Sequence, residues 1–201
     1  MLFRSVKVVE KMLDFIKKKH PQQKIGLLAH SMGGLIALYA IQKYFNDIYT
    51  IVFSNPLLKI KATPNLFKHY LANILACINP YLRLASTVKT EYLSNNSQSN
   101  QDYANDKLIL KSVCIGWYRQ ICLALKNVTK MQPLVPSLVQ LSSYDEVIDS
   151  DYAKKWFHSL NEKQHSLHKL HIYQNARHEL YHELERDLYI QDMIAWFINH
   201  L

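Results

Sequence analysis

The sequence predicts an α/β fold in which helices flank a short parallel sheet and one helical segment is inserted. Short apolar stretches of strand length alternate with longer stretches of helical periodicity, and polar turn residues follow the apolar stretches. Between residues 57 and 131 this alternation stops and helical patterns dominate. Because strands that alternate with helices form parallel sheets, we expect a core over residues 1–56 and 132–201 and a helical cap over residues 57–131.

The first part of the core begins with an amphipathic helix that a run of three lysines and a proline end. Its apolar residues recur at helical spacing: Leu2, Val6, Val9, Leu13 and Ile16. A strand over residues 24–30 and a helix over 32–45 follow. A second strand is predicted over 48–53, where β-branched and aromatic residues are enriched.

The inserted segment has helical patterns over residues 66–78 and 108–125, which a polar tract at 94–101 separates. No strand is expected there. The segment is either a helical stretch of the same domain with a flexible loop, or a cap over a site whose mobile part is the polar tract. The second part of the core is predicted to contain strands over 134–141 and 167–173.

Two helices complete that second part of the core. One is predicted over residues 151–160, between the two strands. The other ends the chain, and its apolar face carries Ile190, Ile194, Phe197 and Leu201.

Ser31 lies where the first strand turns into the following helix, which is the arrangement of a nucleophile elbow. The residues two before and two after such a serine must be small, and here they are Ala29 and Gly33. Gly34 would let the helix pack close to the strand. The backbone N–H of Met32 is a candidate donor for an oxyanion, because it lies at the start of a helix. The alternative is that Ser31 only caps this helix.

Asp145 and His178 also follow predicted strands, so they are expected at the same edge of the sheet as Ser31. In that arrangement Ser31 would attack a substrate, His178 would take its proton, and Asp145 would orient the imidazole and stabilise its charge. Asp149 and Asp151 are competing acids near the same strand. Asp149 is better explained as the cap of the next helix.

The segment His178-Glu179-Leu180-Tyr181-His182 also matches the His-Glu-x-x-His pattern of zinc proteases. That pattern must lie within a helix and needs a third ligand downstream, whereas here it follows a strand and a loop. We therefore predict no metal and no cofactor. His30, next to Ser31, is predicted to point elsewhere and to be structural.

Three motifs resemble the monoacylglycerol lipase and bacterial lysophospholipase branch of the α/β-hydrolases. They are Ala29-His30-Ser31-Met32-Gly33-Gly34, the segment 138–149 and Asn175-Ala176-Arg177-His178-Glu179-Leu180. The chain departs from that branch at Ala29 and Ser142, where glycine is usual, and at Ile148, where valine is usual. The resemblance implies a partial α/β-hydrolase fold with Ser31, Asp145 and His178 as the triad. It also implies a serine ester hydrolase that acts on lipid esters or small esters.

The resemblance further implies that the early strands of the sheet are absent, so we expect an N-terminally truncated fold. The strand before Ser31 would then lie at an exposed edge. The second oxyanion donor, which the family takes from a loop after an earlier strand, would be absent from this chain. The alternative hypothesis is an inactive remnant, or a module that needs an N-terminal partner piece.

The composition limits the partners and the location of the chain. Its net charge is +8, but apart from one run of lysines the basic residues are dispersed, so we expect contact with anionic membrane surfaces rather than with nucleic acid. Three cysteines without a Cys-x-x-Cys pair suit a reducing compartment. Without a secretory apolar region or a run of membrane-spanning length, a cytoplasmic or peripheral membrane location is predicted.

Overall fold

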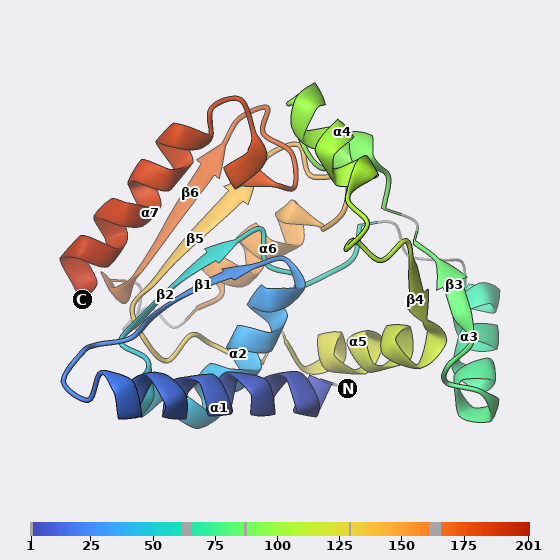
Figure 1. Ribbon diagram of the computed structural model, residues 1–201, viewed down its shortest axis with the longest axis horizontal. Coiled ribbons are helices and arrows are strands. Elements are labelled where there is room, and N and C mark those ends of the chain that lie inside the picture. Colours follow the sequence, from blue (N-terminus) through green and yellow to red (C-terminus); the bar gives the residue numbers. More distant parts are fainter. Residues whose placement is uncertain (1, 62–65, 87, 129, 161–165) are drawn as a thin grey trace.

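A computed structural model describes residues 2–61, 66–86, 88–128, 130–160 and 166–201 (Figure 1). Its centre is a four-stranded sheet in the order β1-β2-β5-β6, in which all neighbouring strands are parallel. The strands are β1 Gly26–His30, β2 Thr50–Ser54, β5 Ser137–Ser142 and β6 His168–Tyr173. The predicted α/β class with a short parallel sheet is confirmed, and the carboxyl ends of all four strands lie at one edge.

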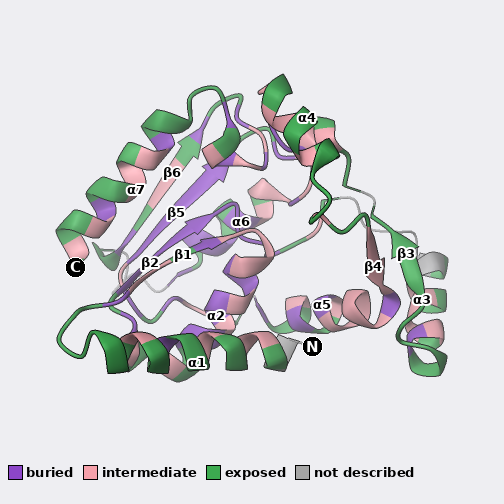
Figure 2. Ribbon diagram, viewed as in Figure 1, coloured by how far each residue is buried: buried purple, intermediate pink, exposed green. Residues whose placement is uncertain are grey.

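Helices cover both faces of this sheet (Figure 1). One face is covered by α7, and the other by α1, α2 and α6. Their bounds are α1 Leu2–Lys19, α2 Met32–Tyr44, α6 Ser150–His158 and α7 Arg186–His200. Because both faces of β2 are covered, the whole strand is buried (Figure 2). Val52 packs with Trp196 of α7, whereas Ile51 and Phe53 belong to the core on the opposite face.

β1 lies at the edge of the sheet, as predicted for the strand that leads to Ser31. Among the described residues it pairs only with β2. The Leu28 side chain is 49% exposed there. A hollow of about 400 Å³ runs beside this edge, between β1, α1 and α2. The edge is therefore apolar as well as open.

The segment 57–131 contains more varied structure than its sequence predicts. Its helices are α3 Leu66–Ile78, α4 Ser97–Asn105 and α5 Ile115–Val128, with a 3-10 helix η2 Thr90–Tyr92. The prediction of no strand is wrong, because β3 Arg83–Ala85 and β4 Ser112–Cys114 pair antiparallel. This pairing also explains why α5 begins at Ile115 and not at residue 108. The division of the chain into a core and a cap stays a prediction.

The polar tract at residues 94–101, predicted to be a flexible loop, contains the start of α4. Asn96 is the N-cap of this helix, and its side-chain oxygen accepts hydrogen bonds from the backbone N–H groups of Gln98 and Ser99. An N-cap of this type satisfies donors that a helix start leaves free. A helix therefore begins within this tract because Asn96 caps it, although the tract contains few apolar residues.

Candidate active site

Ser31 is held between the end of β1 and the start of α2 in a conformation that is rare for serine. Its φ is 49° and its ψ is −118°, and positive φ is unfavourable for a residue with a side chain. It occupies the N-cap position, but its side chain makes no capping hydrogen bond. Its Oγ instead lies 2.8 Å from Nε2 of His178. The alternative that Ser31 only caps α2 is therefore excluded.

The two glycines after the elbow have different surroundings. A Cβ added at Gly34 would lie 2.6 Å from Cβ of Pro56, so the close approach predicted at Gly34 is real, but it is to the loop after β2. A Cβ at Gly33 would meet no heavy atom within 4 Å apart from its chain neighbours and the backbone of its own helix. The prediction that crowding requires a small residue at position 33 is wrong for the described residues.

Asp145 and His178 continue the hydrogen-bonded chain that begins at Ser31. Nδ1 of His178 lies 2.7 Å from Oδ2 of Asp145, and the two side chains are 4% and 0% exposed. The other carboxylate oxygen of Asp145 accepts hydrogen bonds from the backbone N–H groups of Val147 (2.7 Å) and Ile148 (2.9 Å). The turn after β5 thus fixes the carboxylate. A carboxylate facing Nδ1 favours the proton there, which leaves Nε2 free to accept from the Ser31 hydroxyl.

The residues that the sequence offered as alternatives to this arrangement lie elsewhere or have other roles. Asp149 is the N-cap of α6, as predicted, and its carboxylate also bonds to Nζ of Lys59 at 2.8 Å. Asp151 lies exposed in the first turn of the same helix. His178 precedes the 3-10 helix η4 Leu180–His182, and its two ring nitrogens face Ser31 and Asp145. Within the described parts of the chain, no cluster of three or more His, Cys, Asp or Glu side chains could hold a metal ion.

Asn55, which follows β2, links the ends of three chain segments and was not predicted. Its Nδ2 donates to the backbone oxygen of His178 at 2.7 Å, and its Oδ1 accepts from the backbone N–H of Ser142 at 2.8 Å. The residue is fully buried and has a φ of 41°. The signal that could have revealed it is the Ser-Asn-Pro sequence after a buried strand, since asparagine tolerates positive φ.

Glu183 connects the inserted segment to the loop that carries His178, and it too was not predicted. Glu183 is buried, with 3% of the residue exposed. Its carboxylate accepts hydrogen bonds from the backbone N–H groups of Arg177 (2.7 Å) and Asn95 (3.0 Å). The backbone N–H of Glu179 donates to the carbonyl of Leu93 at 2.7 Å. The chain around residues 91–96 therefore supports the histidine loop directly.

His30 does not point away from the site, so that prediction is wrong. Its ring centroid lies 4.8 Å from that of His178, and the ring planes are inclined by 55°. On the far side, its Nε2 lies 3.3 Å from Oε1 of Glu179. A second histidine and a second carboxylate thus stand beside the triad-like arrangement.

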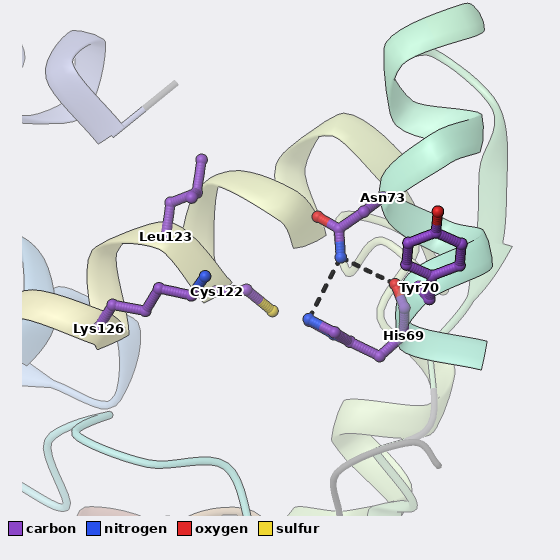
Figure 3. A pocket seen from close by; sticks show the side chains of 6 residues that line it. All are labelled: His69, Tyr70, Asn73, Cys122, Leu123 and Lys126. Atoms are coloured by element: carbon purple, nitrogen blue, oxygen red, sulfur yellow. Dashed lines mark hydrogen bonds between the residues drawn. The ribbon is translucent and has the colours of Figure 1, made fainter. Parts of the chain in front are cut away.

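A separate cavity of about 410 Å³ lies between α3 and α5 (Figure 3). In it, Nδ2 of Asn73 bonds to the backbone oxygen of His69 and lies 3.2 Å from Nε2 of the same residue. The remaining lining residues are Tyr70, Cys122, Leu123 and Lys126. Neither Ser31 nor its partners line this cavity, so it is not the site of their chemistry.

Comparison of the sequence with known protein families agrees with this fold and with the serine elbow. The profile of the family described as serine aminopeptidase, S33, matches residues 3–185 of the chain. The chain belongs to this family. The predicted resemblance to α/β-hydrolases of the monoacylglycerol lipase and lysophospholipase type is confirmed as well, because the proteins that this chain matches include a phospholipase and monoglyceride lipases.

Two relatives show the extent of the sequence similarity. Phospholipase YtpA of Bacillus subtilis (strain 168) is 27% identical over 165 residues, which are 80% of this chain and 62% of that protein. Monoglyceride lipase of Homo sapiens is 32% identical over 181 residues, which are 86% of this chain and 57% of that protein. The chain therefore spans about three fifths of the length of these relatives.

Solved structures show the same fold. The monoacylglycerol lipase of Paleococcus ferrophilus superposes with a TM-score of 0.88 at 21% identity, covering 100% of this chain and 76% of that one. A soluble variant of monoglyceride lipase from Saccharomyces cerevisiae, in complex with a substrate analogue, has a TM-score of 0.80 at 22% identity. That alignment covers 97% of this chain and 67% of that one.

Proposed function

We propose that this chain is a serine hydrolase that cleaves carboxylic esters of lipids through an acyl-enzyme on Ser31. The observation that carries the proposal is the continuous chain of contacts from Ser31 Oγ through His178 to Asp145, with distances of 2.8 and 2.7 Å. The names of the relatives, a phospholipase and monoglyceride lipases, support lipid esters as the substrate class.

In the proposed reaction, Ser31 Oγ attacks the ester carbonyl while Nε2 of His178 takes its proton. Asp145 holds the imidazole and stabilises the imidazolium that forms. His178 then donates this proton to the departing alcohol, which leaves an acyl group on Ser31. A water molecule, deprotonated by His178, attacks the acyl group and releases the fatty acid.

The oxyanion of each tetrahedral intermediate would face the start of α2. We assign the backbone N–H of Met32 as one donor, because it directly follows Ser31 and lies at the positive end of the helix dipole. Loss of one such donor typically lowers kcat by about 10²–10³-fold, so this N–H would contribute strongly to turnover.

The exposed apolar side chains of the segment 57–131 favour contact with a lipid surface. Figure 2 shows α3 and β3 as largely exposed ribbons. The most exposed large apolar side chains there are Phe67 (73%), Ile78 (75%), Tyr81 (81%), Leu108 (89%) and Leu110 (73%). Together with a net charge of +8, they suit peripheral contact with an anionic membrane. No helix in the described part of the chain is long and apolar enough to cross a membrane.

The proposal is tested by labelling with a fluorophosphonate probe and by hydrolysis of p-nitrophenyl butyrate, a monoacylglycerol and a lysophospholipid. Ser31→Ala should abolish labelling and lower hydrolysis by at least about 10³-fold. Ser97→Ala, at an exposed serine in α4, is the matched control and should behave as the wild type.

Two outcomes would contradict the proposal. If folded wild-type protein hydrolyses the three esters no faster than Ser31→Ala, the inactive alternative holds for this chain. If the wild type cleaves an aminoacyl p-nitroanilide and not the esters, the peptidase name of the family describes it better than the lipid names of the relatives.

A further inference from the structure

The side chains of His30 and Glu179 lie within ion-pair distance of each other, directly beside the imidazole of His178. Oε1 of Glu179 is 3.3 Å from Nε2 of His30, and the two imidazole centroids are 4.8 Å apart. The side chains of the pair are 28% and 26% exposed. A charge on either partner therefore acts on His178 through partly dehydrated protein rather than through bulk water, where it would be screened.

The two ring nitrogens of His30 have different neighbours. Its Nδ1 lies 3.2 Å from the hydroxyl of Ser54, which can either donate or accept. The Ser54 hydroxyl can therefore satisfy Nδ1 of His30 whether or not that nitrogen carries a proton. Nε2 of His30 is buried and makes no hydrogen bond with any described residue, although it lies 3.3 Å from Oε1 of Glu179. The contact between His30 and Glu179 is therefore one of charge at short distance rather than an aligned hydrogen bond.

Glu179 carries its negative charge throughout the neutral pH range. Burial opposes ionisation, but the contact with His30 and the nearby charges of His178 and His182 outweigh it, and the pKa of Glu179 is lowered to about 2. The carboxylate also lies 3.4 Å from Nδ1 of His182, which is 61% exposed. Glu179 is thus a permanent anion near the catalytic imidazole, in addition to Asp145.

We propose that Glu179 and His30 are positioning residues that set the proton affinity of His178, Glu179 raising it and a proton on His30 lowering it. The inference rests on the proposed function, because His178 matters as the base for Ser31. Acylation converts His178 into an imidazolium, and a nearby anion stabilises that cation. A proton on His30 offsets this anion and places a like charge beside His178, whose ring centroid is 4.8 Å from that of His30.

Other charged and titratable groups also surround His178 and Glu179, and all of them are present in every variant compared below. They come from the β5–α6 turn, the histidine loop, the segment after β2 and α4: Asp145, Arg177, His182, Lys61 and Tyr103.

The proposal predicts shifts of opposite sign for two variants. Glu179→Gln keeps the size of the side chain and removes its charge, so the pKa of His178 should fall by about 0.5–1 unit. His30→Gln removes the group that can offset the anion, so the pKa of His178 should rise. A merely structural role would loosen the site in both variants and would not produce shifts of opposite sign.

Two measurements on the full chain test this. The first is an NMR titration of ¹³C-labelled histidine, with the His178 signal identified by its loss in His178→Asn. The second is the rate of fluorophosphonate labelling against pH, whose base limb should move with the NMR value. Glu185→Gln, which removes the same charge from an exposed position on the same segment, should move neither.

The outcomes separate the two proposals. A wild-type chain that the probe does not label overturns the proposed function, and the NMR titration still decides whether Glu179 and His30 control His178. A labelled wild type in which Glu179→Gln leaves the His178 titration unchanged overturns the positioning pair alone. Shifts of equal sign in Glu179→Gln and His30→Gln overturn it as well.

Discussion

Replacing Asn55 by alanine should destabilise the protein strongly, because this one side chain joins three segments at the carboxyl edge of the sheet. Asn55 lies after β2, and its Nδ2 holds the carbonyl of His178 while its Oδ1 holds the backbone N–H of Ser142. Ser142 is also buried, at 0% exposure. In Asn55→Ala, a buried donor and a buried acceptor would lose their partners together.

The loss of folding free energy in Asn55→Ala can be estimated from these contacts. Each buried polar group left without a partner costs about 1–3 kcal/mol. Alanine at the φ of 41° found here adds about 1–2 kcal/mol. The sum is about 3–8 kcal/mol, a large part of the roughly 5–15 kcal/mol that stabilises a typical domain. Asn55→Gly avoids the backbone cost alone, so it should be about 1–2 kcal/mol more stable than Asn55→Ala.

Urea unfolding followed by circular dichroism measures these differences. Asn175→Ala is the matched control, because Asn175 also has positive φ (60°) but is exposed, and it should lose only the backbone contribution of about 1–2 kcal/mol. The reasoning is refuted if Asn55→Ala is as stable as Asn175→Ala. It is also refuted if Asn55→Gly restores wild-type stability, since the side-chain contacts would then contribute nothing.

Two further predictions concern the elbow helix and the cap of α6. Gly34→Ala should lower the thermal midpoint, since a Cβ there meets Pro56 at 2.6 Å and overpacking costs about 1–3 kcal/mol, whereas Gly33→Ala should raise stability by about 0.4–1 kcal/mol. Equal effects at the two positions would contradict this. At Asp149, the hydrogen bond from Lys59 holds the pKa of the carboxyl below its usual value. Its stabilisation is therefore present above the unfolded pKa of about 3.9 and is lost as the pH falls through the folded value. Asp149→Asn, which keeps a capping side chain, should cost about 0.5 kcal/mol at pH 7 and less at pH 3 in urea unfolding, and a pH-independent cost would disprove the charge effect.

The sheet and the triad-like contacts were predictable because the information for them is local. Strands covered on both faces contain continuous apolar runs, such as Ile51-Val52-Phe53 in β2. A parallel sheet then brings the residues after its strands to one edge. Ser31 and His178 are separated by 147 positions in the chain and still lie 2.8 Å apart. Knowing that each follows a strand is enough to predict their proximity.

The remaining features depend on contacts that no local pattern reveals. β3 and β4 are only three residues long and β3 is exposed, so neither is recognisable in the sequence, and their pairing changes where α5 begins. Glu183 is buried because it binds Asn95, which is 88 positions earlier in the chain. His30 was predicted from sequence spacing to point away, yet the sharp turn at Ser31 brings its ring to that of His178. Spacing along a strand does not predict side-chain direction where the strand ends.

The backbone strain of the protein is concentrated where the proposed chemistry takes place. Among the described residues, the non-glycine residues with positive φ are Ser31, Asn55 and Asn175. Each lies just after a strand, at the same edge of the sheet, and none of the described glycines has positive φ. Such conformations cost about 1–3 kcal/mol each and persist only where the surroundings enforce them. Here the contacts of Asn55 with Ser142 and His178 supply that enforcement. The edge is therefore held rigidly in an unfavourable conformation that directs Ser31 toward His178, which is the property that a preorganised nucleophile requires.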